Sequence, residues 1–336
     1  LKNWDKYSED NLRAPLRSKK KVPTSRTIET PRYAKASTAS GVSGGTGEEL
    51  LNFVPPMEAQ LQKGMIYPRT ASAVGVGAQP LTVISPKDLL VTTRTDIEVA
   101  GIVQNMRTVL VNGKTVQAND KGAFQTVVGL TPGKNNINIE AGDNVEARRV
   151  LRLFTYNDIA GISQKSVIEY LATLGYFSEG NSFQPSKPVA RDELVSLAVK
   201  LAGLRTPAVR QASYPDVPAN YWAAPSIYAA AEAGIVDLKG SFNPKQNVTR
   251  AEAINIIVKA LGKSVPVTNL KTAPYNDVRI DHPYANGVAI AKALGLITGG
   301  EDFRPDAMLT RAELAVWLVK TESVKKQIIQ LRDFGK

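Results

Sequence analysis

Three arginines recur at matched positions in the second half of the chain, and their type suits the recognition of an anion. Arg191, Arg250 and Arg311 each follow a glycine by sixteen residues and precede a glutamate by two. A guanidinium can bond a carboxylate through two parallel N–H groups. The chemistry indicated is therefore binding of an acidic group. The alternative is that each arginine pairs with a neighbouring acid of its own chain.

These arginines belong to three copies of one sequence unit with a period of about sixty residues. Each copy has Tyr-x-Asp, then a glycine after an apolar run, a phenylalanine eight residues later, a proline two residues on, and the arginine after six more. In order, the copies read Tyr156, Gly175, Phe183 and Pro185; Tyr214, Gly234, Phe242 and Pro244; Tyr275, Gly295, Phe303 and Pro305. A repeat of this length indicates one supersecondary unit that is used three times.

Each copy predicts two helices joined by a loop. Apolar residues fall at the third, sixth, seventh and mostly tenth positions after each arginine, which is the pattern of a helix with one buried face. Thr249 with Glu252, and Thr310 with Glu313, predict capping boxes, whereas Ala190 lacks the capping hydroxyl. Because one helix pair cannot bury its own stripe, we expect the copies to pack around a shared pseudo-threefold core.

Together, Tyr-x-Asp, a helix, Gly-Ile-Val, Phe-x-Pro and Thr-Arg-Ala-Glu at these spacings resemble the S-layer homology repeat. The resemblance covers residues 156–322, about half of the chain, and three tandem copies are that family's usual complement. It implies an all-α bundle of three lobes that holds surface proteins on a bacterial cell wall. The implied ligands are anionic cell-wall glycans, commonly ketal-pyruvylated polysaccharide, or peptidoglycan-associated polymers, bound in grooves between lobes.

The resemblance also implies a glycan-binding arginine and an aromatic residue. The arginine of Thr-Arg-Ala-Glu matches Arg250 and Arg311, and less well Arg191, whose motif is Ala-Arg-Asp-Glu. The aromatic residue, whose face can stack on a sugar ring, matches Trp222. Tyr284 is adjacent to the matching place in the third copy. The alternative is that Trp222 is buried in the core and does not contact a sugar.

Two further positions of the family pattern are kept only in part. The aspartate before the first helix matches Asp216 and Asp277, which we expect to cap a helix or orient an arginine rather than to bind an anion directly. A glycine that opens the backbone to ligand matches Gly299, whereas Leu238 and Glu179 stand at the other two places. We therefore expect at least one groove to be closed.

Residues 81–154 have a different pattern, made of short runs that often alternate apolar and polar residues. Asn112-Gly113 is a strong hairpin signal, and Pro132-Gly133 and Gly142-Asp143 mark further turns. Six or seven strands at roughly ten-residue spacing predict an antiparallel sandwich. Residues 109–113, 121–124 and 130–139 resemble bacterial immunoglobulin-like modules of exported proteins, which implies a spacer or interaction unit.

The first 80 residues are predicted to be an extended basic arm and linker. Residues 1–35 carry ten lysines and arginines against four acids, and residues 37–47 are small. Too little apolar surface is present to offset a backbone ordering cost of about 1–2 kcal/mol per residue. We expect the isolated arm to be disordered and to bind other subunits of an envelope assembly; a tail that lies on its own domains is the alternative.

The predicted domains are thus the arm at 1–80, an all-β immunoglobulin-like sandwich at 81–154, three repeats within 155–322 and a C-terminal tail at 323–336. The repeats are expected at 155–204, 213–262 and 274–322.

Composition excludes several kinds of chemistry. The chain has no cysteine, so it has no thiolate metal site or cysteine nucleophile, and we predict neither a metal nor a cofactor. Its one histidine, His282, directly precedes Pro283 at an expected helix start and is not predicted to be catalytic. The net charge of +11 favours acidic partners, but charge alone does not predict nucleic-acid binding. No run of about eighteen apolar residues is present to span a membrane.

The sequence therefore predicts a non-enzymatic, exported protein of the bacterial cell envelope that binds anionic wall glycan or peptidoglycan. No signal peptide is visible, and the start at Leu1 is consistent with a trimmed precursor. One alternative is a structural subunit of a large envelope complex or filament, whose repeats contact protein. A glycan hydrolase would need two carboxylates about 5–10 Å apart, and the spacing of Glu193, Glu252 and Glu313 explains them as caps.

Overall fold

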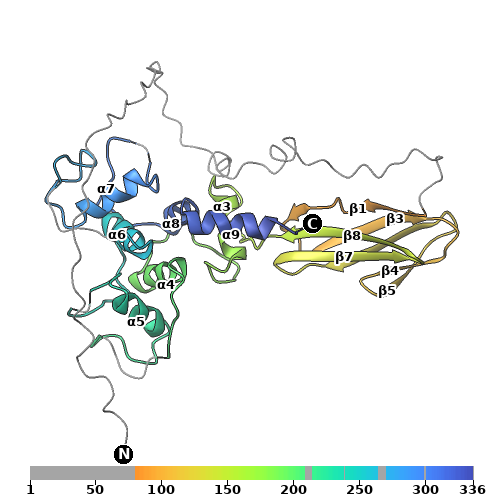
Figure 1. Cartoon of the computed structure of the whole chain (residues 1–336), viewed down its shortest axis with the longest axis horizontal. Helices are drawn as coiled ribbons and strands as arrows, with labels where there is room; N and C mark the ends of the chain where they lie inside the picture. The colour runs from red at the N-terminus through yellow and green to blue at the C-terminus, as the bar shows by residue number, and fades with distance from the viewer. Residues whose placement is uncertain (1–79, 209–213, 238, 264–269, 299, 336) are drawn as a thin grey trace, which may run out of the picture. The chain divides into compact units, whose positions relative to one another are not determined.

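The computed structural model describes residues 80–208, 214–237, 239–263, 270–298 and 300–335 (Figure 1). The predicted arm at 1–80 therefore lies almost wholly outside the described residues. The strands are β1 (Leu81–Ser85), β2 (Leu90–Thr92), β3 (Asp96–Val103), β4 (Thr108–Val111), β5 (Lys114–Gln117), β6 (Ala123–Gly129), β7 (Gly133–Ala141) and β8 (Asn144–Arg152). The helices are α3 (Lys165–Thr173), α4 (Arg191–Leu201), α5 (Ala224–Glu232), α6 (Arg250–Ala260), α7 (Ala285–Ala293), α8 (Arg311–Val319) and α9 (Glu322–Arg332).

The strands form the predicted β-sandwich. One sheet has the order β1-β3-β6 and the other has the order β2-β8-β7-β4-β5. Buried side chains of both sheets, Val99 and Phe124 from one and Val111 and Ile139 from the other, share a core. The Asn112-Gly113 hairpin joins β4 to β5, and both residues have the positive φ that a two-residue turn of this kind requires.

Two features of the sandwich differ from the sequence prediction. β2 was not predicted, because it is only three residues long and shows too little alternation to be recognised, and β5, of four residues, was indicated only by the Asn112-Gly113 turn before it. The sandwich is also not purely antiparallel, since β2 pairs with β8 in parallel.

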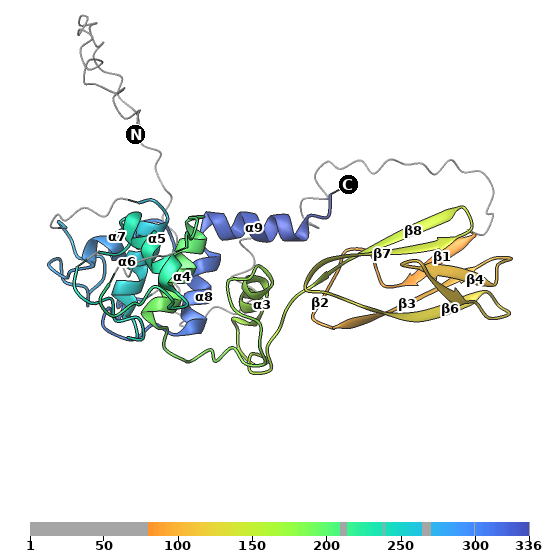
Figure 2. The same ribbon diagram turned by 90° about the horizontal axis from the view of Figure 1, so that it is seen from below.

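The helices pair across the repeats. α4 packs against α5, α6 against α7, and α8 against α3. The second helix of each repeat therefore contacts the first helix of the next repeat, and the last repeat returns to the first. Figure 2 shows the same helices from a second direction. This arrangement explains how each stripe of apolar residues finds a partner that its own repeat does not supply.

A ring of backbone hydrogen bonds joins the three repeats at their centre. Val189 N–H donates to Leu309 O, Val248 N–H to Val189 O, and Leu309 N–H to Val248 O, at 2.9, 3.0 and 3.0 Å. The three side chains are fully buried. Each residue lies just before the second helix of its repeat, so the ring fixes the start of α4, α6 and α8. It confirms the expected pseudo-threefold core.

The predicted helix caps are found in part. α8 has the full capping box, in which Thr310 and Glu313 bond each other reciprocally. At α6 the Thr249 hydroxyl accepts from the Glu252 amide, but the reciprocal bond is absent from the described contacts of this cap. The Glu252 carboxylate bonds Arg191 at 2.8 Å. Ala190 gives α4 no side-chain cap, as its sequence predicts.

The C-terminal tail contains the helix α9. Thr321 caps it by accepting from the Val324 amide, and Val324 and Ile328 are buried in the helical core. In the described residues, no helix is both long and apolar enough to cross a bilayer.

Candidate functional site

The aspartates of the Tyr-x-Asp motifs hold the loop that leads to each second helix. Asp216 accepts from the amides of Phe242 and Asn243 at 2.8 and 2.6 Å. Asn243 has a φ of 55°, so these bonds stabilise a left-handed residue. Desolvation raises the pKa of the Asp216 carboxyl, but the two amide bonds outweigh it and hold the pKa below its usual range.

The third copy has the same loop anchor. Asp277 accepts from the amides of Phe303 and Arg304 at 2.7 and 2.5 Å. The carboxylates of Asp216 and Asp277 thus act on backbone amides, and each fixes the loop that carries a phenylalanine carbonyl.

Those carbonyls belong to a second ring, formed by the three arginines. Each arginine bonds the phenylalanine carbonyl and the glutamate of the next repeat in the cycle. The pairs are Arg191 with Phe242 O and Glu252, Arg250 with Phe303 O and Glu313, and Arg311 with Phe183 O and Glu193. Their side chains are only 19%, 12% and 14% exposed. The arginines therefore hold neighbouring repeats together. Each pairs with an acid of its own chain, which was the alternative to binding an external anion.

The three arginines differ in what covers them. The Arg250 guanidinium lies over two rings, 4.9 Å from the Phe303 centroid and 5.2 Å from the Trp317 centroid. Arg311 lies over Phe183 and Phe177 in the same way. Of the rings in the described residues, only that of Phe242 lies under Arg191, at 6.0 Å.

The sequence explains this difference. Trp317 is the sixth residue after Arg311, and Ile256 is the sixth after Arg250. Phe177 is the second residue after Gly175, and Val236 stands at the matching place in the second repeat. Two smaller aliphatic side chains therefore occupy the places where the other repeats present an aromatic ring.

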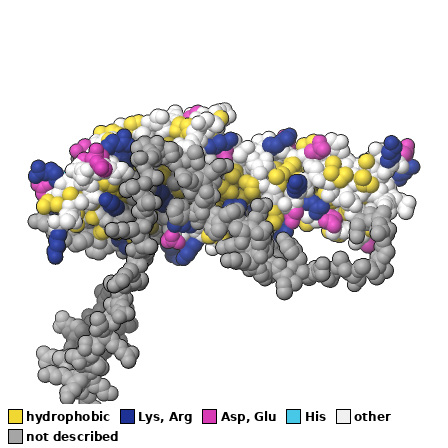
Figure 3. All heavy atoms as spheres, turned by 90° about the horizontal axis from the view of Figure 1, so that it is seen from above, with side chains coloured by type: hydrophobic (Ala, Val, Ile, Leu, Met, Phe, Trp, Pro, Cys, Tyr) yellow, Lys and Arg dark blue, Asp and Glu magenta, His cyan; other side chains and the backbone are white. Residues whose placement is uncertain are grey.

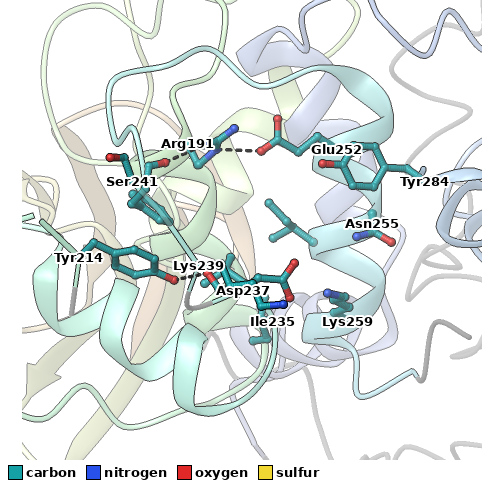
Figure 4. A pocket seen from close by; sticks show the side chains of 13 residues that line it. Arg191, Tyr214, Ile235, Asp237, Lys239, Ser241, Glu252, Asn255, Lys259 and Tyr284 are labelled. Atoms are coloured by element: carbon teal, nitrogen blue, oxygen red, sulfur yellow. Dashed lines mark hydrogen bonds and ion pairs between the residues drawn. The ribbon is translucent and has the colours of Figure 1, made fainter. Parts of the chain in front are cut away.

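A cavity of about 190 Å³ lies beside Arg191 (Figure 4). Its walls come from the second repeat, from the start of α4 and from Tyr284 before α7. The residues that line it are Arg191, Tyr214, Ile235, Val236, Asp237, Lys239, Ser241, Phe242, Glu252, Asn255, Ile256, Lys259 and Tyr284. Of the arginines, the one with the weakest match to the family motif is thus the one that lines this cavity.

The charges in the cavity favour an anion. Arg191, Lys239 and Lys259 face Asp237 and Glu252, and Glu252 is already engaged by Arg191. The Nη2 of Arg191 makes no hydrogen bond to any residue that the structure describes, whereas its Nε and Nη1 are both bonded. Burial raises the pKa of the Tyr284 hydroxyl, which therefore stays protonated and able to donate.

Most of these lining residues were not among the predicted site residues. A signal for one of them was present, because a lysine follows each arginine by nine residues, at Lys200, Lys259 and Lys320. Asn255 and Lys239 have no counterpart of the same type in the other repeats and carried no such signal.

The remaining predicted site residues either lie away from this cavity or are not among the residues that the structure describes. Trp222 does not line the cavity; it is 59% exposed, with Lys245 Nζ 6.0 Å from its ring centroid. That amine also donates to Asp192 Oδ2 at 3.0 Å. Gly299 lies outside the described residues. Among the residues described, no group of three acids or histidines is placed to hold a metal ion.

Comparison with known families agrees with this architecture. The S-layer homology domain family matches residues 155–195, 213–254 and 274–315. This chain carries three tandem S-layer homology domains. The family described as glucodextranase, domain B, matches residues 80–152. The S-layer homology domains are therefore preceded by an immunoglobulin-like sandwich module.

Several proteins share part of this chain. It is 26% identical over 174 residues to an uncharacterized cell wall amidase of Bacillus anthracis, covering 51% of this chain and 32% of that protein. It is 31% identical over 170 residues to an amylopullulanase of Thermoanaerobacterium thermosulfurigenes, covering 48% of this chain and 9% of that enzyme. An S-layer protein of Bacillus anthracis is 31% identical over 136 residues, covering 39% of this chain and 15% of its own length. The chain thus spans a third or less of each of these relatives.

Proposed function

We propose that this chain is a non-enzymatic protein of the bacterial cell envelope that attaches to an anionic cell-wall glycan or peptidoglycan through its S-layer homology domains. The proposal rests chiefly on the cavity beside Arg191, which combines three cations with the rings of Tyr214 and Tyr284. Cations bind acidic groups, and aromatic rings give a sugar ring a flat apolar surface. The relatives named as S-layer proteins support an exported protein at the cell wall.

The residues take different parts in this proposal. Arg191 and Tyr284 contact the glycan inside the cavity. Trp222 offers a separate stacking surface, on which Lys245 supplies a positive charge. Arg250 and Arg311 act mainly as locks between repeats. Asp216 holds the loop beside Arg191, and Asp277 holds the loop beside Arg250. Gly299 would give a ligand access to backbone in the third repeat. The sandwich is a spacer, and residues 1–80 tether other subunits of the assembly.

The distribution of surface charge supports assigning recognition to the cavity. On the face drawn in Figure 3, Lys and Arg side chains are scattered among acidic ones and do not gather in one patch. A diffuse surface would attract a polyanion weakly and would be screened by salt at about 8–10 Å. A recessed site with fixed cations gives a defined contact.

A non-enzymatic role is proposed although two relatives are named as enzymes. The match covers 32% of the amidase and 9% of the amylopullulanase, so most of each enzyme has no counterpart here. The glutamates that start α4, α6 and α8 are bonded to arginines, which is the wrong setting for a general acid.

Sedimentation of the full chain with purified sacculi tests the proposal. We expect the chain to sediment with intact sacculi and to stay in solution with acid-stripped sacculi that have lost their secondary polymer. Arg191→Ala should lower the bound fraction at fixed concentration. A chain that stays in solution with both preparations would contradict wall attachment.

A second candidate is a structural subunit that contacts protein through its helical domains. An apolar groove of about 440 Å³ favours it, formed where α4, α5 and α6 end and lined in part by Leu201, Leu204 and Leu261. Leu204→Asp would then disrupt an envelope complex isolated from cells while leaving sacculus binding unchanged. Loss of sacculus binding in the same variant would instead place this groove in wall attachment.

A further inference from the structure

The only histidine of the chain caps the start of α7, and its side chain is only 18% exposed. His282 Nδ1 accepts a hydrogen bond from the amide of Tyr284, the residue just before α7, at 3.1 Å. The backbone carbonyl of His282 accepts from the amide of Ala285, the first residue of α7, at 2.9 Å. The first amides of a helix have no partner inside the helix, so His282 supplies acceptors for two of them.

The side-chain half of this cap requires a neutral imidazole. A neutral imidazole has one nitrogen that accepts a hydrogen bond, whereas both nitrogens of the protonated ring donate. Histidine changes its charge between about pH 5 and pH 8, where ordinary carboxyl groups stay ionised. Protonation of His282 therefore sets its Nδ1–H group against the Tyr284 N–H group and breaks their bond.

The charged groups of the surrounding loops do not replace the lost bond. Asp306 Oδ1, in the segment before α8, lies 3.7 Å from His282 Nε2, but the Asp306 side chain is 88% exposed, and exposed ion pairs contribute little. Asp281 is already bonded by Arg279 at 2.9 and 2.8 Å. The positive end of the helix dipole also disfavours a cation at the start of α7. Protonation of His282 therefore weakens this helix start.

α6, all of whose residues the structure describes, packs against α7 and supplies no free acid to the protonated ring. The acid of α6 is Glu252, which is bonded to Arg191 at 2.8 Å. The first residue of α6, Arg250, is a cation bonded to Glu313 at 2.6 Å. Ala251 stands between them. The start of α6 therefore gives the histidine no carboxylate that would hold it in the charged form.

The other two repeats have a different residue at this place. Tyr221 and Ile162 precede the glycine of their repeats by thirteen residues, as His282 does. The Tyr221 hydroxyl donates to Asp192 of α4 at 2.6 Å, and Asp192 occupies the position that Ala251 has in α6. A tyrosine hydroxyl stays protonated up to about pH 10, and isoleucine does not titrate. Of the three repeats, only the third therefore has at this place a side chain whose charge changes near neutral pH.

We propose that His282 is an acid-sensitive cap, which holds Tyr284 and the start of α7 in place when neutral and releases them when protonated. The side chain of Tyr284 lines the cavity beside Arg191 (Figure 4). Release of the Tyr284 backbone therefore disturbs one wall of that cavity. This consequence for binding rests on the proposed wall attachment, whereas the cap itself is a property of the fold.

Amide hydrogen exchange in the full chain tests the cap without any ligand. The protection factor of the Tyr284 amide is measured at about pH 7.5 and at about pH 5, on either side of the histidine titration. We expect it to fall about fivefold at the lower pH, which is the effect of one lost hydrogen bond. Because the chain has one histidine, the proton signals of its ring report the charge of His282 directly. Protection of Tyr284 that does not follow this titration would overturn the proposal.

Two substitutions separate the acceptor from the charge. In His282→Asn, the side-chain oxygen can accept from the amide two residues on, as asparagine does in turns, and the side chain does not titrate. This variant should protect the Tyr284 amide equally at both pH values. His282→Ala has no side-chain acceptor and should give low protection at both. A drop in His282→Asn as large as that in wild type would overturn the assignment, because carboxyl groups elsewhere would then cause it.

Binding to sacculi at the same two pH values separates this inference from the proposed function. We expect wild type to bind about fivefold more weakly at the lower pH and His282→Asn to bind equally at both. A wild-type chain that binds at neither pH contradicts wall attachment, while the exchange of the Tyr284 amide still decides the cap. Equal wild-type binding at both pH values, with exchange that follows the histidine, would overturn the link between the cap and the cavity.

Discussion

The sites around Arg191 and Arg250 have the same backbone arrangement but different side chains beside the guanidinium group. Both guanidinium groups bond a glutamate and a phenylalanine carbonyl of the next repeat. Trp317 lies over Arg250, and the smaller Ile256 leaves room beside Arg191. The comparison shows that one repeat geometry can serve either as a packed lock between repeats or as an open site. The volume of a single side chain, six residues after the motif arginine, separates the two.

Removing the motif arginine should give the largest difference in stability between the packed Arg250 site and the open Arg191 site. Arg250→Ala should lower the free energy of unfolding by about 3 kcal/mol, because it leaves the Phe303 carbonyl without its partner and takes from the partly buried Glu313 carboxylate its closest cation. Arg191→Ala should cost only about 1 kcal/mol, since water in the cavity can reach the groups it leaves behind. Denaturant midpoints of the two variants check this. Equal losses would show that both arginines are locks.

Opening the filled site beside Arg250 should lower the free energy of unfolding somewhat less. Trp317→Ile removes a ring that is 5% exposed, stacks on Phe303 and contacts the Arg250 guanidinium. We expect a loss of about 2 kcal/mol, below the 3–5 kcal/mol typical of Trp→Ala, because isoleucine refills part of the space. Thermal unfolding measures it. A loss below about 0.5 kcal/mol would mean that the tryptophan does not support the Arg250 site.

Filling the open site should remove function with little effect on stability. Ile256→Trp places a ring where Arg250 already has one, and the cavity has room for it. We expect sacculus affinity to fall about tenfold or more, and the free energy of unfolding to change by less than about 1 kcal/mol. Ile257→Val, in the adjacent core position, is the control for a general packing effect. Unchanged affinity in Ile256→Trp would exclude this cavity as the binding site.

The smallest expected effect concerns the loop anchor beside the cavity. The lowered pKa of Asp216 means that its carboxylate contributes stability above the ordinary aspartate value, near pH 4. That contribution disappears as the pH falls through the lowered pKa. Asp216→Asn should therefore be less stable than wild type at neutral pH, by up to about 1 kcal/mol, and the difference should shrink below about pH 4. A difference that is constant from pH 7 to 3 would contradict this role.

Much of the fold could be predicted from sequence because its signals are local. The sixteen-residue spacing from glycine to arginine gave the helix–loop–helix unit, and Asn112-Gly113 gave the β4–β5 hairpin. The pairing of α4 with α5 rather than with its own first helix, α3, could not be predicted. An amphipathic stripe indicates that one face of a helix is buried but does not identify the element that covers it.

The candidate site was predictable in its residue types and less so in its location. Motif matching favoured Arg250 and Arg311, because it compares residues along the chain and not the rings that cover them. The substitution that opens the site is Ile256, an apolar residue that appears in sequence as an ordinary core position. Its meaning depends on knowing that Trp317, the seventh residue of α8, packs on a guanidinium from another repeat.

The most direct measurement is a map of amide chemical shifts in the full chain as soluble oligosaccharides released from sacculi are added. The account predicts that shifts concentrate at Ser241, Asn255 and Lys259, and that Trp317 and its neighbours do not move. Shifts that cluster around Trp317 or Phe177 instead, with Asn255 and Lys259 unchanged, would contradict it.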